Sequence, residues 1–261
     1  MLTKVHLPSS AEEAVRLLAG GGWLLGGGTV VMPRVNTGAV PVESLISLRH
    51  AGLDAIRVGD GTVDLGAAVT LADLGAHDEL AFLRPVVRSI ASPPVRNLAT
   101  VGGNLFAVQP HGDLAVALLA LDAEVHILGA AGTRTAKIGE PIGRDELVTG
   151  VHFGLPAHWR YRKAMRRKHN SASIVTVAAV LDLDGDTVRA ARIALGGVAP
   201  RPVRAHAAEQ ALVGNRLADA ASAAGEAARE GTAPFDDAYA SAWYRTRVLP
   251  VHVRRALLEE D

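Results

Sequence analysis

Ser92-Pro93-Pro94-Val95-Arg96-Asn97-Leu98-Ala99-Thr100-Val101-Gly102-Gly103-Asn104-Leu105 is the most informative segment of the chain. Its two prolines predict the end of a helix over residues 83–90, because proline does not continue a helix. Its two glycines permit positive φ and the close approach of a ligand. Successive backbone N–H groups in such a turn can form a concave site for an anion, and the amide of Asn104 adds a donor and an acceptor. The segment therefore predicts an anion-binding loop.

A second glycine-rich loop lies upstream, directly after the apolar segment Trp23-Leu24-Leu25, which predicts a short strand. The loop reads Gly26-Gly27-Gly28-Thr29 and continues into Val30, where a short helical turn is predicted. Three consecutive glycines are costly in backbone entropy, which favours a role in turning N–H groups toward a ligand. The hydroxyl of Thr29 can donate to a phosphate oxygen. Two such loops in one domain suit a diphosphate.

Taken singly, each glycine loop is also compatible with a tight turn between a strand and a helix. The run Gly20–Gly22 is interpreted in that way, as the end of a helix. Neither loop matches the Gly-x-x-x-x-Gly-Lys-Ser/Thr or Gly-x-Gly-x-x-Gly nucleotide motifs. The sequence therefore disfavours a P-loop NTPase and a standard Rossmann dinucleotide site.

Composition narrows the function further. The 261 residues carry 27 Lys plus Arg and 27 Asp plus Glu, so the basic excess typical of nucleic-acid binders is missing. With no cysteine, the chain cannot ligate an iron–sulfur cluster through thiolates. A redox group would therefore be a bound organic cofactor or belong to a partner chain. The sequence shows neither an apolar signal core nor a run of about 18 apolar residues, which predicts a cytoplasmic protein without a membrane span.

Local signals predict several elements. Capping boxes are expected at Ser10 with Glu13 and at Thr70 with Asp73, and hairpins at Asp60-Gly61 and Asp184–Asp186. An apolar helix is expected to start at Asp113, and the Ala-rich C-terminal part predicts helices over about 205–213, 217–230 and 238–258. The texture changes near Pro156, from mixed strands and helices to a small sheet followed by helices, which places a domain boundary at about residue 155.

These motifs, in this order, resemble the FAD-binding medium subunits of molybdenum hydroxylases of the xanthine dehydrogenase and carbon monoxide dehydrogenase type. Leu25–Pro33 resembles the family segment Ala-Gly-Gly-Thr-Asp-Leu-Leu-Pro, and Ser92–Leu105 matches the second family signature. Asp113-Leu114 falls where the family has Asp-Leu, and Leu195–Pro200 resembles its C-terminal domain. The resemblance covers nearly the whole chain.

The resemblance implies an α+β fold. A two-part α/β FAD-binding domain of the vanillyl-alcohol-oxidase (PCMH) type is expected over residues 1–155, with subdomains of about 1–54 and 55–155. A C-terminal domain of the CO dehydrogenase flavoprotein type, with a small antiparallel sheet and helices, is expected over 156–261.

The resemblance also implies the cofactor site. The residues expected to bind FAD, chiefly at its diphosphate, are Leu25, Gly26, Gly27, Gly28, Thr29, Val30, Thr100, Val101, Gly102, Gly103 and Asn104. Asp113 is expected near the sugar portion, and Lys163 matches a family lysine close to the flavin. The chain departs from the family at Val30, where the family has Asp, and at Ser171-Ala172-Ser173, where the family has aromatic or acidic residues.

Simpler interpretations of the same residues stay open. Asp113 could cap the helix that it starts, and Lys163 could belong to a solvated basic surface or face an iron–sulfur subunit. His111 and His169 lack the convergent ligands that zinc requires. We therefore expect no metal site and no catalytic acid–base residue in this chain.

By the same resemblance, the chain would be an electron-transfer subunit. It would take electrons from the 2Fe-2S clusters of a small subunit and pass them from FAD to NAD, oxygen or a quinone. The molybdenum cofactor is expected on a large subunit, the complex being a dimer of heterotrimers, with no nucleic-acid partner. The alternatives are a stand-alone FAD-dependent oxidoreductase of the same fold class and a non-catalytic scaffold subunit that has lost FAD.

Overall fold

The computed structural model describes residues 2–168 and 170–260, which form two compact units. The first unit comprises the described residues up to Val87, Ser92–Ala107 and Glu124–Phe153. The second comprises Arg88–Ala91, Val108–Ala123 and the described residues from Gly154 onward. The chain therefore passes between the units several times. This division by contacts is finer than the predicted boundary at residue 155, which stays a prediction.

A small parallel sheet opens the first unit. Its strands are β1 (Lys4–His6), β3 (Ser44–Ser47) and β2 (Trp23–Leu25), in the order β1-β3-β2 within the described residues. Helix α1 (Ala11–Leu18) packs its buried face against this sheet. Its predicted capping box is confirmed, because the hydroxyl of Ser10 accepts a hydrogen bond from the N–H of Glu13. Strand β2 ends at Leu25, so the first glycine loop begins at the carboxyl end of a parallel strand.

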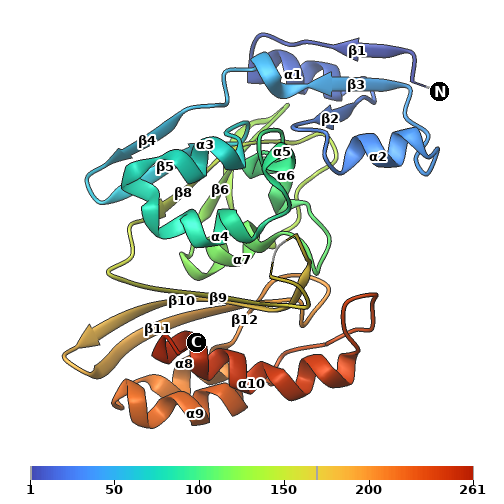
Figure 1. Cartoon of the computed structure of the whole chain (residues 1–261). Helices are drawn as coiled ribbons and strands as arrows, with labels where there is room; N and C mark the ends of the chain where they lie inside the picture. The colour runs from blue at the N-terminus through green and yellow to red at the C-terminus, as the bar shows by residue number, and fades with distance from the viewer. Residues whose placement is uncertain (1, 169, 261) are drawn as a thin grey trace. The chain divides into compact units, whose positions relative to one another are not determined.

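A larger sheet completes the first unit (Figure 1). The described strands follow the order β4-β5-β8-β6-β7. Their bounds are β4 Ile56–Gly59, β5 Thr62–Gly66, β8 Leu147–Gly154, β6 Glu124–Gly129 and β7 Gly132–Lys137. One face is apolar and buried, with Val63 and Leu65 of β5 among its residues, whereas Asp64 between them lies on the opposite face. This alternation is the period of a sheet with one buried face.

Short helices connect the strands of the first unit or lie beside them. They are α2 Val31–Asn36, α3 Leu71–Ala76, α4 Arg84–Ser89, α5 Pro93–Arg96 and α6 Val101–Leu105. The second predicted capping box is confirmed at α3, where Thr70 accepts a hydrogen bond from the N–H of Asp73. Helix α6 lies against the end of β5, because the N–H of Gly102 donates to the carbonyl of Ala67.

The second unit is a sheet between helices. The described strands are β12 (Val203–Arg204), β11 (Thr187–Gly196), β10 (Ser173–Asp184) and β9 (His158–Met165), paired antiparallel in that order. Helix α7 (Asp113–Ala120) packs on one face. Helices α8 (His206–Leu212), α9 (Leu217–Ala227) and α10 (Ala242–Leu258) pack on the other (Figure 1). Strand β10 is consequently apolar on both faces.

The remaining local predictions are largely confirmed. Asp60-Gly61 joins β4 to β5, and Gly185-Asp186 joins β10 to β11. The last helix begins at Ala242 rather than near 238, because Ser241 caps it by accepting a hydrogen bond from the N–H of Tyr244. None of the helices in the described residues combines the length and the apolar composition that a membrane-spanning helix needs.

Candidate functional site

The first glycine loop packs against the segment that leads into the second. A Cβ placed on Gly27 would overlap the carbonyl oxygen of Leu98, and one placed on Gly26 would lie 2.8 Å from Oγ1 of Thr100. Gly28 adopts a φ of +72°, in the left-handed region that favours glycine. Packing or backbone conformation therefore favours glycine at all three positions. The close approach of Leu98 and Thr100 is one that the sequence pattern did not predict.

The amides of this first loop are available to a ligand. Among the described residues, no acceptor is found for the backbone N–H groups of Gly27, Gly28, Thr29 and Val30. Unpaired backbone donors are rare in native proteins unless water or a ligand satisfies them. Consecutive free N–H groups at a left-handed glycine form the concave arrangement that binds phosphate groups. The first loop therefore has the donor set of an anion site.

The second loop has no such set of free donors, and the prediction of an N–H nest at residues 101–104 is wrong. The N–H groups of Val101 and Gly102 donate to the carbonyls of Val69 and Ala67, each at 2.9 Å. Those of Gly103 and Asn104 donate to Oγ1 and O of Thr100, at 3.1 and 2.9 Å. Residues 101–105 are a short helix capped by Thr100 and docked on the chain after β5, so their amides are already satisfied.

The second loop offers a side chain instead. Asn104 is 8% exposed, and its Oδ1 has no hydrogen-bond partner among the described residues. Leaving a buried acceptor unsatisfied costs about 1–3 kcal/mol, so such atoms call for an explanation. A ligand that donates to Oδ1 would remove this cost. The orphaned oxygen and the free amides of the first loop fit a bound cofactor.

Asp113 and Lys163 form a buried ion pair in the second unit. Nζ of Lys163 lies 2.8 Å from Oδ2 of Asp113, and the two side chains are 3% and 5% exposed. Oδ1 of Asp113 accepts hydrogen bonds from the hydroxyls of Ser173 and Thr176, both at 2.7 Å. The interpretation of Lys163 as a solvated residue is therefore wrong. Asp113 is also not a helix cap, since the N-cap of α7 is Gly112.

Two further residues join this network. Lys163 also donates to the carbonyl of Ser89 at 2.8 Å, and the hydroxyls of Ser89 and Tyr161 lie 2.8 Å apart. Burial, together with the negative charge of Asp113, raises the pKa of Tyr161 well above its ordinary value. Sequence reasoning missed Tyr161 and Ser89. The one available signal was the strand period, which puts residues 161 and 163 on the same face of β9.

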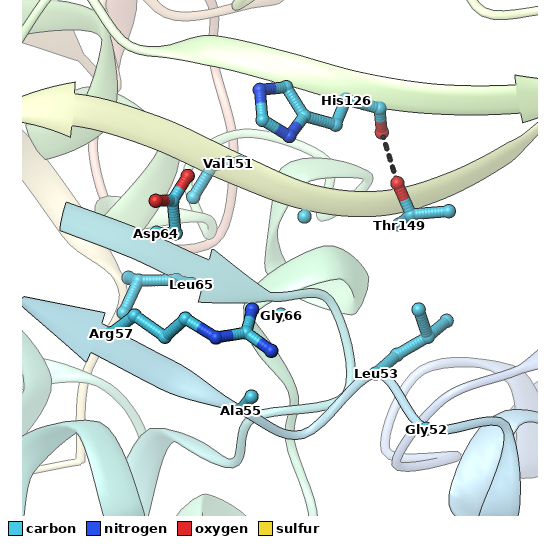
Figure 2. A pocket seen from close by; sticks show the side chains of 11 residues that line it. Gly52, Leu53, Ala55, Arg57, Asp64, Leu65, Gly66, His126, Thr149 and Val151 are labelled. Carbon is cyan, nitrogen blue, oxygen red and sulfur yellow. Dashed lines mark hydrogen bonds between the residues drawn. The ribbon is translucent and has the colours of Figure 1, made fainter. Parts of the chain in front are cut away.

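A separate cavity of about 180 Å³ lies on the polar face of the larger sheet (Figure 2). Arg57, Asp64, His126 and Thr149 supply its polar side chains, and Asp64 is paired with Nδ1 of His152 at 2.9 Å. Pockets for drug-sized ligands measure roughly 300–1,000 Å³, so this cavity cannot enclose a dinucleotide. Gly66 lines it and is followed by Ala67, on which the second loop docks. No sequence pattern predicted this cavity.

The histidines that the structure describes do not assemble a metal site. Within the described residues, no group of three or more His, Asp or Glu side chains is placed to hold a metal ion. His111 lies against Tyr239, with ring centroids 6.1 Å apart. His169 lies outside the described residues.

Two protein families account for most of the sequence. Residues 2–152 match the FAD binding domain in molybdopterin dehydrogenase. The chain belongs to this family. Residues 159–260 match the CO dehydrogenase flavoprotein C-terminal domain. The predicted resemblance, the α+β fold class, FAD as the cofactor and the oxidoreductase class are thereby confirmed.

Relatives match nearly the whole chain. The carbon monoxide dehydrogenase medium chain of Afipia carboxidovorans is 32% identical over 97% of this chain and 94% of its own length. The xanthine dehydrogenase FAD-binding subunit of Escherichia coli O157:H7 is 28% identical, with 97% and 94% covered.

Solved structures agree. A chain of quinoline 2-oxidoreductase from Pseudomonas putida 86 superposes with a TM-score of 0.91 at 28% identity, covering 100% of this chain and 96% of that one. A chain of the Cu,Mo-CO dehydrogenase gives a TM-score of 0.90 at 30% identity, covering 99% and 98%.

Proposed function

We propose that this chain is the electron-transferring flavoprotein subunit of a molybdenum hydroxylase complex. The observation that carries the proposal is the loop Gly26–Val30, whose free amides and obligatory glycines suit the FAD diphosphate. Medium chains of multi-subunit dehydrogenases are relatives over nearly their whole length, which supports a partnership with other subunits. The absence of cysteine supports the assignment of iron–sulfur clusters to a partner.

The residues divide the work of holding FAD in the following way. Backbone donors from Leu25–Val30, with the Thr29 hydroxyl, would bind the diphosphate. Asn104 would accept a hydrogen bond through Oδ1, while Val101, Gly102 and Gly103 form the helical turn that presents it. Contacts of Thr100, Asp113 and Lys163 with FAD stay predictions. The two hydroxyl bonds and the ion pair of Asp113 leave its carboxylate little capacity for a further donor.

When bound, FAD supplies a centre that accepts electrons one at a time and releases them in pairs. The protein needs no acid–base residue for this role. The partners would be a molybdenum-cofactor large subunit and a 2Fe-2S small subunit in a dimer of heterotrimers. The acceptor would be NAD, oxygen or a quinone, and the complex would be cytoplasmic.

Purification of the native complex tests this proposal against a stand-alone flavoenzyme. We expect the chain to co-purify with a cysteine-rich chain and a molybdenum-binding chain. Once separated from them, this subunit should contain neither iron nor molybdenum. A single-chain yellow protein that oxidises a substrate by itself would overturn the proposal.

A further inference from the structure

One ammonium group contacts residues on both sides of the segment 92–107, which carries the second glycine loop. Residues 92–107 belong to the first unit, but the residues that flank them, 88–91 and 108–123, belong to the second. Nζ of Lys163 binds the carbonyl of Ser89 on one side and Oδ2 of Asp113 on the other, each at 2.8 Å. Ser89 and Asp113 are far apart in the sequence, and the whole of α5 and α6 lies between them.

The ion pair between Lys163 and Asp113 is buried and is supported by further hydrogen bonds. Both charged side chains are almost fully buried, and the hydroxyls of Ser173 and Thr176 satisfy the second carboxylate oxygen. Removing one partner of such a pair leaves an uncompensated buried charge, which is strongly destabilising. The hydroxyl of Tyr161, next on the same face of β9, holds Ser89 through its side chain as well.

We propose that Lys163 is a positioning residue that holds together Ser89 and Asp113, which flank segment 92–107, and thereby pre-orders the second glycine loop. Closing a flexible segment has an entropic cost that a ligand would otherwise have to meet on binding. With the ends fixed, the docking of Val101 and Gly102 on residues 67–69 needs no ligand. The benefit to the cofactor rests on the proposed function, whereas the ordering of the segment does not.

Hydrogen exchange on the full-length chain without flavin tests the ordering. The variant Lys163→Met/Asp113→Asn removes the tether without leaving a lone buried charge. We expect the amides of Val101, Gly102 and Asn104 to exchange faster by on the order of tenfold or more, while those of β10 and β11 stay unchanged. The matched control is Arg204→Met/Glu209→Gln, which removes a different, largely buried ion pair of the second unit and should leave segment 92–107 unaffected.

The milder variant Tyr161→Phe removes one hydrogen bond to Ser89 and no charge, so it keeps the test decisive if the double variant does not fold. It should speed exchange in the same segment by a smaller factor. Unchanged exchange in segment 92–107, or an equal rise throughout β10 and β11, would overturn the positioning role.

An FAD titration of the same proteins separates this inference from the proposed function. We expect the dissociation constant of the Lys163→Met/Asp113→Asn variant to rise by about tenfold, which corresponds to 1.4 kcal/mol. If the unmodified chain does not bind FAD while the exchange result holds, the proposed function fails and the tether stands.

Discussion

At the scale of single residues, Gly27 is the described glycine with the least space for a Cβ atom. Any Cβ there meets the Leu98 carbonyl, so Gly27→Ala must push the two loops apart. We predict a loss of FAD affinity on the order of 100-fold, or about 2.8 kcal/mol, measured by flavin fluorescence titration. Gly59→Ala is the matched control, since a Cβ at Gly59 meets nothing within 4 Å. Equal FAD affinities for both variants would contradict the role given to Gly27.

Asn104 supports a prediction in which stability and binding separate. Its buried Oδ1 has no partner among the described residues, so Asn104→Leu removes an unsatisfied acceptor. The free energy of unfolding of the flavin-free chain should not fall. The affinity for FAD should drop by about tenfold, the worth of one hydrogen bond of about 1–1.5 kcal/mol. Chemical denaturation and FAD titration check the two halves, and a variant that binds FAD normally would sink the assignment.

Local residue patterns identified the glycine loops but not what their amides do. Glycine content and an adjacent asparagine look alike in both loops. The acceptors that satisfy Val101 and Gly102 lie at residues 67–69, and no local pattern links the two segments. For the same reason the orphaned Oδ1 of Asn104 became visible only with the fold.

At the scale of elements, α10 and β9 meet in a pH-sensitive contact. Burial lowers the pKa of His252 to about 4, helped by the positive charges of Arg162 and Arg255. As the pH falls, the unfolded chain takes up this proton near 6.5, before the folded chain does. The contribution of His252 to the free energy of unfolding is therefore fully present above about pH 6.5 and is lost as the pH falls toward about 4.

The variant His252→Gln checks this linkage. Urea unfolding at about pH 7 and about pH 4.5 should show a smaller loss of unfolding free energy in the variant than in the unmodified chain. NMR titration of the His252 ring gives the pKa directly. Equal losses in the two proteins, or a ring that titrates near 6.5, would contradict the burial of this side chain.

The secondary structure followed closely from capping boxes and hairpin turns, because these signals are local. Strand β9 did not, since its basic sequence suggested a solvated surface. The structure divides it by face: Trp159 and Tyr161 contact the α7 side, whereas Arg162 reaches His252 of α10. A strand in a sheet that is packed on both faces can bury a charge only where an oppositely charged partner is present. For Lys163 that partner is Asp113, which lies 50 residues away in the sequence, so no local pattern could reveal it.

At the scale of the whole molecule, the order of motifs was more informative than any one of them. Both family matches, over residues 2–152 and 159–260, follow the order that the sequence motifs predicted. The repeated passage of the chain between the two units was not predictable, because contacts rather than sequence texture define it. The segment between two of these passages carries half of the candidate site.

The most direct test of the account is the flavin content of the full-length chain. The purified, FAD-supplemented protein should be yellow, with one FAD per chain released by heat and no iron. Gly27→Ala should be depleted of flavin under the same conditions. A colourless protein that releases no flavin would contradict the central claim that Gly26–Val30 and Asn104 form an FAD site.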